Sequence, residues 1–272
     1  MQRALKSAEN SRPFFIIGHR GAAGHVHENT IASFVEALNL KADMVELDVR
    51  FTADEKLVLF HDEVIRATGG RSKLISKISF AELKEIASTL GFALASLEEL
   101  FDLLAKKIPL VIEIKSAGFE SELLNSMAHF NFCPQTVISS FHPEILNRLN
   151  EIKCPYNIAL IIGRGDLMTK KILNKRKLSE LVTTLKIEAL HLQGSIISEQ
   201  LVASLKEMGI KIFAWTVDEP DSMKKLIRLG IDGIITNKPD ILYNVCLELS
   251  QELPVLMCPA ANSVSRFAYR IM

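Results

Sequence analysis

Short, almost continuously apolar segments alternate with segments of helical pattern along this chain, and the alternation restricts the folds it can adopt. Strands that are apolar on both faces belong to parallel sheets covered by helices. The predicted strands are 14–18, 44–49, 110–115, 136–141, 157–162, 189–193, 211–216 and 233–236. The predicted helices are 29–40, 79–88, 96–107, 143–151, 178–185, 198–208 and 221–229. Repeated β-then-α units with eight strands indicate an α/β fold of the TIM (β/α)8 barrel type.

An open, doubly wound sheet is the alternative architecture. It would place a glycine-rich phosphate loop directly after the first strand, but residues 18–24 (GHRGAAG) do not have that spacing. The length of 272 residues also suits one barrel of ~250 residues. We predict a single domain over 14–249, between an N-terminal extension (1–13) and a C-terminal tail (250–272).

A β-hairpin is predicted directly after the second strand. The segment 50–60 is too short for a helical crossover between parallel strands, so the chain is expected to turn back at Asp54-Glu55. Counting back from a two-residue turn places His61 opposite Asp48, although Asp-Glu lacks the glycine that such turns favour. In this register His61 would arrive beside the carboxylates of the second strand.

Charged residues interrupt the otherwise apolar strands. Glu46 and Asp48 stand at positions i and i+2 of one strand and therefore point to the same side. Burying two like charges together is unfavourable unless a cation neutralises them, and divalent Mg²⁺ or Ca²⁺ prefers carboxylate oxygens. An ordinary ion-pair network is the alternative. Glu113 and Lys115 repeat the spacing on the next strand.

These charges lie toward the C-terminal ends of their strands, as do His19 and Arg20 after the first strand. In a TIM barrel this end carries the active site, because the loops that follow the strands meet there. The strand pattern therefore predicts one site that combines carboxylates, basic residues and a histidine.

Composition narrows the class of partner. Lys plus Arg and Asp plus Glu both number 32, so no overall field attracts nucleic acid or an anionic membrane. No run approaches the ~20 apolar residues of a membrane span, and the N-terminus lacks the apolar region of a secretory signal. The four cysteines have no metal-ligand spacing. We expect a cytoplasmic protein with no nucleic-acid partner and no stable membrane anchor.

A series of motifs runs from about Ile17 to Asp240. In order they are Gly18-His19-Arg20-Gly21, Glu28-Asn29-Thr30, Val45-Glu46-Leu47-Asp48-Val49, His61-Asp62, Glu113-Ile114-Lys115, Ser140-Phe141, Trp215-Thr216-Val217-Asp218 and 229–240 (LGIDGIITNKPD). Each is weak alone, but the joint match is specific, and it resembles the glycerophosphodiester phosphodiesterase family. The resemblance implies a PLC-like phosphodiesterase barrel that hydrolyses small-molecule glycerophosphodiesters to sn-glycerol 3-phosphate and an alcohol. It also implies one divalent metal ion, Mg²⁺ or Ca²⁺, with Mn²⁺ as a further candidate.

The resemblance implies roles for individual residues. The catalytic histidines of the family match His19 and His61, and its metal-binding carboxylates match Glu46, Asp48 and Glu113. The phosphate-contacting basic residues match Arg20 and Lys115, and aromatic residues near the glycerol end of the substrate match Phe141 and Trp215.

These residue types suit attack on an anionic phosphodiester. Fixed cations neutralise charge on the phosphate, and imidazole titrates near pH ~6.5, which suits proton transfer. The family mechanism implies attack by the glycerol 2-hydroxyl and a cyclic phosphate that water then opens. The sequence leaves open which histidine acts first as the base.

The chain departs from the family pattern at His27, Ala67, Ala95-Ser96 and Asn237. We expect these departures to affect loop geometry and substrate preference and to leave the catalytic residues untouched. Two alternative functions remain: a lysophospholipase D-like activity on lipid substrates, and a catalytically inactive binding protein on the same fold. Retention of the histidines, carboxylates and Lys115 argues against the second.

Overall fold

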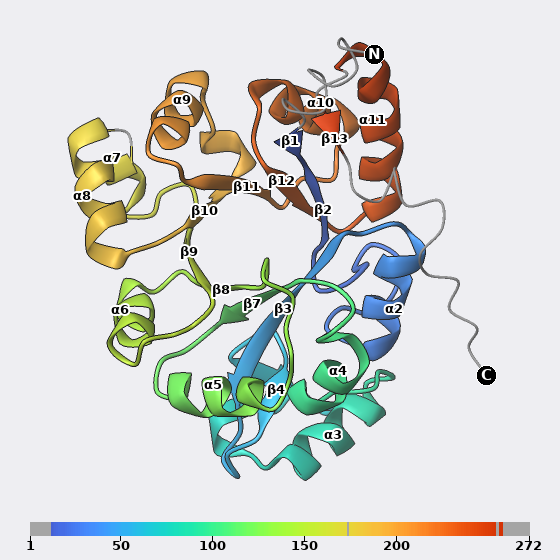
Figure 1. The fold of residues 1–272 in the computed structure, drawn as a ribbon. Helices are drawn as coiled ribbons and strands as arrows, with labels where there is room; N and C mark the ends of the chain where they lie inside the picture. The colour runs from blue at the N-terminus through green and yellow to red at the C-terminus, as the bar shows by residue number, and fades with distance from the viewer. Residues whose placement is uncertain (1–11, 173, 254–255, 258–272) are drawn as a thin grey trace.

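Eight parallel strands close into a barrel in the computed structural model, which describes residues 12–172, 174–253 and 256–257 (Figure 1). The strands are β2 (Phe15–Gly18), β3 (Met44–Phe51), β7 (Leu110–Ile114), β8 (Val137–Ser140), β9 (Asn157–Ile162), β10 (Ala189–Gln193), β11 (Lys211–Trp215) and β12 (Gly233–Thr236). Pairing of β2 with both β12 and β3 closes the ring. The predicted TIM barrel is confirmed.

Helices surround the barrel on its outside (Figure 1). They are α2 (Ile31–Asn39), α3 (Phe80–Thr89), α4 (Leu97–Leu104), α5 (Glu120–Ala128), α6 (Pro143–Glu151), α7 (Thr169–Ile172), α8 (Lys175–Leu185), α9 (Glu199–Glu207), α10 (Pro220–Leu229) and α11 (Pro239–Glu252). The side chains of Thr30, Ser79 and Ser96 each accept a hydrogen bond from a backbone N–H in the first turn of α2, α3 and α4. Helices α5, α7 and α11 were not predicted. Helix α5 follows Phe119, whose side chain makes no capping hydrogen bond.

The predicted hairpin is formed by β3 and the antiparallel strand β4 (Leu57–Leu59). Strand β2 is short and pairs with β3 only at Met44 and Val45, so β4 can pair with the later part of β3. The predicted register was wrong by one residue, because Phe60, and not His61, lies opposite Asp48. The backbone N–H of Phe60 donates to the Asp48 carbonyl at 3.0 Å. The Thr52 backbone N–H donates to the Lys56 carbonyl at 3.0 Å, so three residues form the turn between them, and Glu55 takes the left-handed conformation with φ of 61°.

The segment after this hairpin was predicted as a loop. It contains a second, small hairpin made of β5 (Val64–Arg66) and β6 (Ser72–Leu74), followed by a 3₁₀ turn at Ile75–Lys77. A second 3₁₀ turn lies at Gly194–Ile196, after β10.

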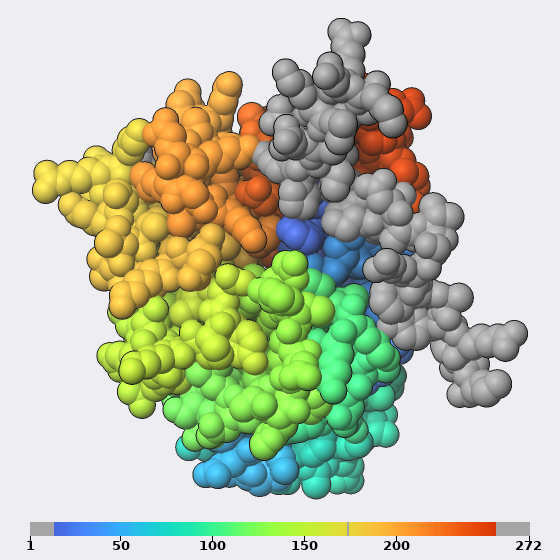
Figure 2. Space-filling view, in the orientation of Figure 1, coloured from blue at the N-terminus to red at the C-terminus, as the bar shows by residue number. Residues whose placement is uncertain are grey.

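The barrel interior is built in layers, and side chains fill the ring that the ribbon leaves open (Figure 2). One apolar layer takes a residue from each strand: Ile17, Met44, Val111, Val137, Ala159, Ala189, Phe213 and Ile235. Side chains alternate along a strand, so residues two positions later also face inward, one layer nearer the C-terminal ends. These residues are His19, Glu46, Glu113, Ser139, Ile161, His191, Trp215 and Asn237. The apolar layer thus forms the floor beneath a mostly polar layer.

The two ends of the described chain meet in a short parallel pair, β1 (Arg12–Pro13) with β13 (Leu256–Met257). Helix α11 continues past the predicted domain boundary at residue 249. Most of the predicted tail, and residues 1–11 of the predicted extension, lie outside the described residues. Within the described part of the chain, no helix has both the length and the apolar character needed to cross a bilayer.

Candidate active site

Three buried carboxylates form the centre of the site. One oxygen each from Glu46, Asp48 and Glu113 lies within 4.8 Å of the others. The pairing of β3 with β7 brings them together, because Asp48 is directly opposite Glu113 and Glu46 lies two residues earlier. Burial, followed by the neighbouring negative charges, raises the pKa of Glu46 well above its ordinary value. The same causes raise the pKa of Glu113 to about 7.

Asp48 differs from its two neighbours because basic residues face it. Arg20 Nε lies 3.0 Å from Asp48 Oδ2 and Lys115 Nζ lies 3.3 Å from Oδ1. Burial acts to raise the pKa of Asp48, but these two positive charges outweigh it and hold the pKa below its ordinary value. The site therefore contains one firmly ionised carboxylate beside two that resist ionisation.

This donor set fits a hard divalent cation. Buried carboxylates supply oxygen ligands, and Asp48 Oδ1 accepts no hydrogen bond from any residue that the structure describes. A cation placed among the three groups would offset their mutual repulsion. An all-oxygen set suits Mg²⁺, Ca²⁺ or Mn²⁺.

Asn29 and Glu28 hold this cluster in place, although the family resemblance implied no role for either residue. The Asn29 amide donates from Nδ2 to Asp48 Oδ2 at 2.8 Å, and its Oδ1 accepts from the Asp48 backbone N–H at 3.2 Å. Arg20 Nη1 donates to both Glu28 oxygens at 2.7 and 2.8 Å. The motif Glu28-Asn29-Thr30 was the available sequence signal for both contacts.

A tight turn after β2 places the next pair of functional residues. Arg20 has φ of 49° and its backbone N–H donates to Glu46 Oε2 at 2.9 Å. Gly21 follows with φ of 89°, and a Cβ there would lie 2.5 Å from Ser33. Only glycine fits this combination of positive φ and close approach. The Gly18–Gly21 motif therefore serves to direct His19 and Arg20 toward the carboxylates.

His19 is held by a chain of polar contacts from β12. Its Nδ1 lies 2.7 Å from Asn237 Oδ1, and Asn237 Nδ2 donates to Asp218 Oδ2 at 2.7 Å. Because an ionised carboxylate only accepts, the Asn237 amide must face Asp218 with its NH₂ and His19 with its oxygen. His19 Nδ1 therefore carries the proton, and the lone pair of Nε2 is available to the cavity. Burial, then the charge of Arg20, lowers the pKa of His19.

This contact corrects one expectation from the sequence. Asn237, which stands where the family usually has aspartate, contacts His19, one of the two predicted catalytic histidines. The departure therefore reaches a predicted catalytic residue as well as the loop. The sequence could not reveal this, because His19 and Asn237 are 218 positions apart and meet only through the β2–β12 pairing.

Restoring the aspartate by Asn237→Asp is expected to move the pH profile. The added negative charge stabilises the His19 imidazolium and raises its pKa. The limb of the kcat/KM profile that His19 controls then moves to higher pH, whether His19 acts first as base or as acid. Asn39→Asp, at the C-terminal end of α2, is the control and should leave the profile unchanged. Superimposable profiles for Asn237→Asp and the parent chain would contradict the assignment.

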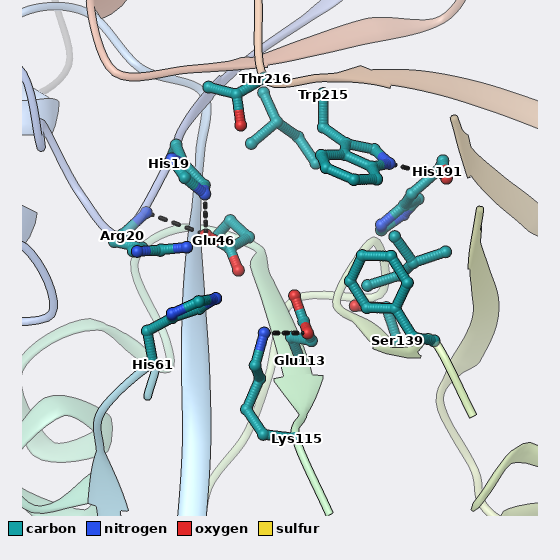
Figure 3. A pocket seen from close by; sticks show the side chains of 13 residues that line it. His19, Arg20, Glu46, His61, Glu113, Lys115, Ser139, His191, Trp215 and Thr216 are labelled. Atoms are coloured by element: carbon teal, nitrogen blue, oxygen red, sulfur yellow. Dashed lines mark hydrogen bonds and ion pairs between the residues drawn. The ribbon is translucent and has the colours of Figure 1, made fainter. Parts of the chain in front are cut away.

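His61 lines the cavity on the same side as His19 and Arg20 (Figure 3). Its side chain is 35% exposed, and its Nδ1 lies 2.7 Å from Asp62 Oδ1. The Arg50 guanidinium donates from Nε and Nη2 to the His61 carbonyl at 2.9 and 2.7 Å. Despite the different register, the β4 hairpin brings His61 to the carboxylate cluster.

Aromatic side chains form the opposite wall. The rings of Phe141 and Trp215 meet edge to face with centroids 5.4 Å apart. Lys115 Nζ lies 5.7 Å from the Phe141 centroid, and Trp215 Nε1 donates to the His191 carbonyl at 3.0 Å. The two predicted aromatic residues thus share one wall, where an apolar part of a ligand can pack.

All predicted site residues except the deeply buried Asp48 line this one cavity, which has about 490 Å³ of unfilled space, part of it open to solvent. The structure adds residues that the sequence had not singled out for the site: Ser139, Ile161, His191, Thr216 and Ile235. Strand alternation was the available signal for most of them. Two other histidines of the loop after β2 do not line this cavity: His25 Nε2 lies 2.9 Å from Asp240 Oδ1, and His27 stacks on Phe92.

The electrostatics of Glu113 give a second prediction. Its pKa is about 7 in the folded protein and 4.5 ordinarily, so its contribution to metal-free stability is full below pH 4.5 and is lost as the pH rises through about 7. The glutamine of Glu113→Gln cannot ionise. Without metal, this variant should therefore have a higher melting temperature than the parent protein at pH 8, by about 2–4 °C for each kcal/mol gained in the free energy of unfolding. The difference in melting temperature should be smaller at pH 5.

Glu122→Gln, which changes an exposed carboxylate on α5, is the control for this thermal unfolding experiment and should show no such pH-dependent gain. Equal melting temperatures of Glu113→Gln and the parent protein at pH 8 would show that Glu113 carries no unfavourable charge.

Comparison with known proteins extends the likeness over most of the chain. The model of the glycerophosphoryl diester phosphodiesterase family matches residues 19–241. A glycerophosphodiester phosphodiesterase of Caldanaerobacter subterraneus subsp. tengcongensis is 34% identical over 245 residues, which cover 85% of this chain and 96% of the relative.

Solved structures agree in fold. The glycerophosphodiester phosphodiesterase of Thermotoga maritima superimposes with a TM-score of 0.72 and 28% identity, covering 85% of this chain and 98% of that one. A phosphodiesterase of Oleispira antarctica, in complex with the product sn-glycerol-3-phosphate, gives a TM-score of 0.73 at 22% identity, covering 86% and 96%.

Proposed function

Because the chain belongs to the glycerophosphoryl diester phosphodiesterase family, we propose that it hydrolyses glycerophosphodiesters to sn-glycerol 3-phosphate and an alcohol, with the help of one divalent metal ion. The observation that carries this proposal is one cavity in which two carboxylates, two basic residues and the two predicted catalytic histidines face one another, with the third carboxylate, Asp48, buried beside them. Such a set can neutralise a phosphodiester and move its protons. The product bound by the Oleispira phosphodiesterase supports the same substrate class.

Charge neutralisation is the first requirement. Arg20 and Lys115 are fixed beside Asp48 and can contact the non-bridging oxygens of a phosphate in the cavity. Glu46, Asp48 and Glu113 would hold the divalent ion, which supplies Lewis-acid stabilisation of the phosphate charge. Mg²⁺ and Ca²⁺ are the proposed ions, and Mn²⁺ fits the same ligands.

Proton transfer is assigned to His19 and His61. In the first step one imidazole takes the proton of the glycerol 2-hydroxyl as that oxygen bonds to phosphorus. The other imidazole gives a proton to the alcohol oxygen as its bond to phosphorus breaks. The products of this step are the free alcohol and a cyclic phosphate of glycerol.

The second step reverses the two roles. The imidazole that is now neutral takes a proton from water as the water oxygen bonds to phosphorus. The protonated imidazole returns its proton to the glycerol 2-oxygen as the ring bond breaks. Both histidines regain their starting states, and sn-glycerol 3-phosphate is released.

The decisive experiment measures release of sn-glycerol 3-phosphate from glycerophosphocholine and glycerophosphoethanolamine, first without metal and then with Mg²⁺, Ca²⁺ or Mn²⁺ restored. Metal-dependent release is expected, and the faster pairings would identify the preferred ion and alcohol. Absence of release with every ion would overturn the proposal and favour the inactive binding protein.

We also propose that the partner is a small-molecule phosphodiester and that the protein is located in the cytoplasm. Cys133 and Cys154 carry free thiols, as is usual in a reducing compartment.

A further inference from the structure

Two buried polar atoms in the cavity wall have no role in the reaction described above. Ser139 Oγ and His191 Nε2 make no hydrogen bond to any residue within the described part of the chain. Ser139 is 0% exposed and His191 is 1% exposed, yet both line the cavity. A buried polar group without a partner costs about 1–3 kcal/mol, so each atom is poised to gain from a polar ligand.

The two side chains come from β8 and β10, away from the turn after β2 that carries His19 and Arg20. Ser139 lies beside Glu113 on the neighbouring strand, and His191 is aligned with Ile161 on β9. In the close view the side chains of His19, Arg20 and His61 lie on one side of the cavity, while Ser139 and His191 lie on the other (Figure 3). The apolar layer of the barrel closes the space beneath them.

The chemistry of the pair suits a neutral hydroxyl. Burial lowers the pKa of His191 to about 3, so its imidazole is uncharged and offers no attraction to a phosphate. A serine hydroxyl can donate or accept, and a neutral imidazole nitrogen does one or the other according to its tautomer. A ligand hydroxyl can therefore satisfy both atoms together, by donating to one and accepting from the other.

We propose that Ser139 Oγ and His191 Nε2 bind the terminal hydroxyl of the glycerol group, and so select glycerol over other alkyl phosphodiesters. This inference rests on the proposed function. With the phosphate at Arg20 and Lys115, and the 2-hydroxyl close enough to attack phosphorus, the hydroxyl on carbon 1, the carbon farthest from the phosphate, is the one that reaches the far wall. The glycerol carbons then pack against Ile161 and Trp215.

The proposal bears on the lipid alternative. In a 1-acyl lysophospholipid the terminal oxygen carries the acyl chain, so it cannot donate a hydrogen bond. Deacylated glycerophosphodiesters are therefore the expected substrates, and 1-acyl lysophosphatidylcholine is expected to be turned over poorly.

The test compares glycerophosphocholine with the phosphocholine ester of propane-1,2-diol, which keeps the 2-hydroxyl and lacks only the terminal one. The parent enzyme should prefer glycerol by about 10- to 100-fold in kcat/KM, as expected for one unsatisfied polar contact. Ser139→Ala and His191→Leu should each reduce the ratio of kcat/KM for glycerophosphocholine to kcat/KM for the propane-1,2-diol ester. Calorimetry with sn-glycerol 3-phosphate and propane-1,2-diol phosphate gives the corresponding ratio of dissociation constants and does not require turnover.

Ser140→Ala is the matched control. Its hydroxyl is on the same strand but donates to the Ile114 carbonyl at 2.8 Å, outside the cavity. This variant should keep the kcat/KM preference of the parent enzyme for glycerophosphocholine over the propane-1,2-diol ester. A preference that persists in Ser139→Ala and His191→Leu, or no preference in the parent enzyme, would overturn the inference. Ser139→Ala alone decides if His191→Leu does not fold.

A wrong reaction and a wrong role for Ser139 and His191 would give different results in these experiments. If the parent enzyme hydrolyses neither diester, the proposed reaction is wrong, and the ratio of dissociation constants still decides whether the pair recognises a terminal hydroxyl. If both diesters are hydrolysed equally well and both phosphates bind equally, the reaction stands and the assignment of Ser139 and His191 is wrong.

Discussion

Replacing Glu46 by glutamine is expected to lower kcat/KM by about a thousandfold or more and to leave the protein folded. Glutamine keeps an oxygen that can accept from the Arg20 N–H, but it removes one negative ligand from the three-carboxylate cluster. Loss of several kcal/mol of electrostatic stabilisation corresponds to a rate loss of this size, since each 1.36 kcal/mol is tenfold.

The fold is expected to tolerate this change because Glu46 is an unfavourable charge in the metal-free protein, where its pKa lies well above the ordinary value. Thermal unfolding without metal should therefore show equal or higher stability for Glu46→Gln. Glu85→Gln, an exposed change on α3, serves as the activity control. Full activity of Glu46→Gln at low metal concentration would rule out the proposed metal site.

His61→Ala is expected to lower kcat by about 10²- to 10⁴-fold, the usual contribution of a positioned acid or base. The side chain is 35% exposed, so its removal opens space to water and leaves no void in the core. Thermal stability should change little. Activity is measured with glycerophosphocholine and saturating metal.

Chemical rescue separates a proton-transfer role from a structural one. Added imidazole can enter the space left in His61→Ala from solvent and should restore part of the rate in proportion to its concentration. His129→Ala, an exposed histidine at the end of α5, is the matched control and should be neither slowed nor rescued. Full activity of His61→Ala without imidazole would remove this residue from the mechanism.

The structure joins the reaction to substrate choice through the layered barrel. The floor is apolar, and the layer above it carries Glu46 and Glu113 as well as Ser139 and His191. The proposed metal ligands and the proposed hydroxyl-binding pair therefore share one inward-facing layer, in which strand pairing sets the spacing of the side chains.

Short-range pattern was enough for the fold. Apolar runs, helix caps such as Ser96 and the strand-helix alternation are local properties of the chain, and they predicted the barrel strands close to their observed bounds. The i, i+2 spacing of Glu46 and Asp48, and of Glu113 and Lys115, also fixed which side chains share a face, because strand alternation has a period of two.

The hairpin register, the contacts between distant strands and the burial of polar atoms were decided by the tertiary structure alone. The hairpin register depended on a three-residue turn with Glu55 at positive φ, which a count along the chain could not distinguish from a two-residue turn. Asn237 reaches His19 only because β12 closes against β2. Ser139 and His191 have ordinary sequence surroundings, and their unsatisfied atoms become evident only when the barrel encloses them. Burial and cross-strand neighbours are properties of the closed ring, so no local pattern encodes them.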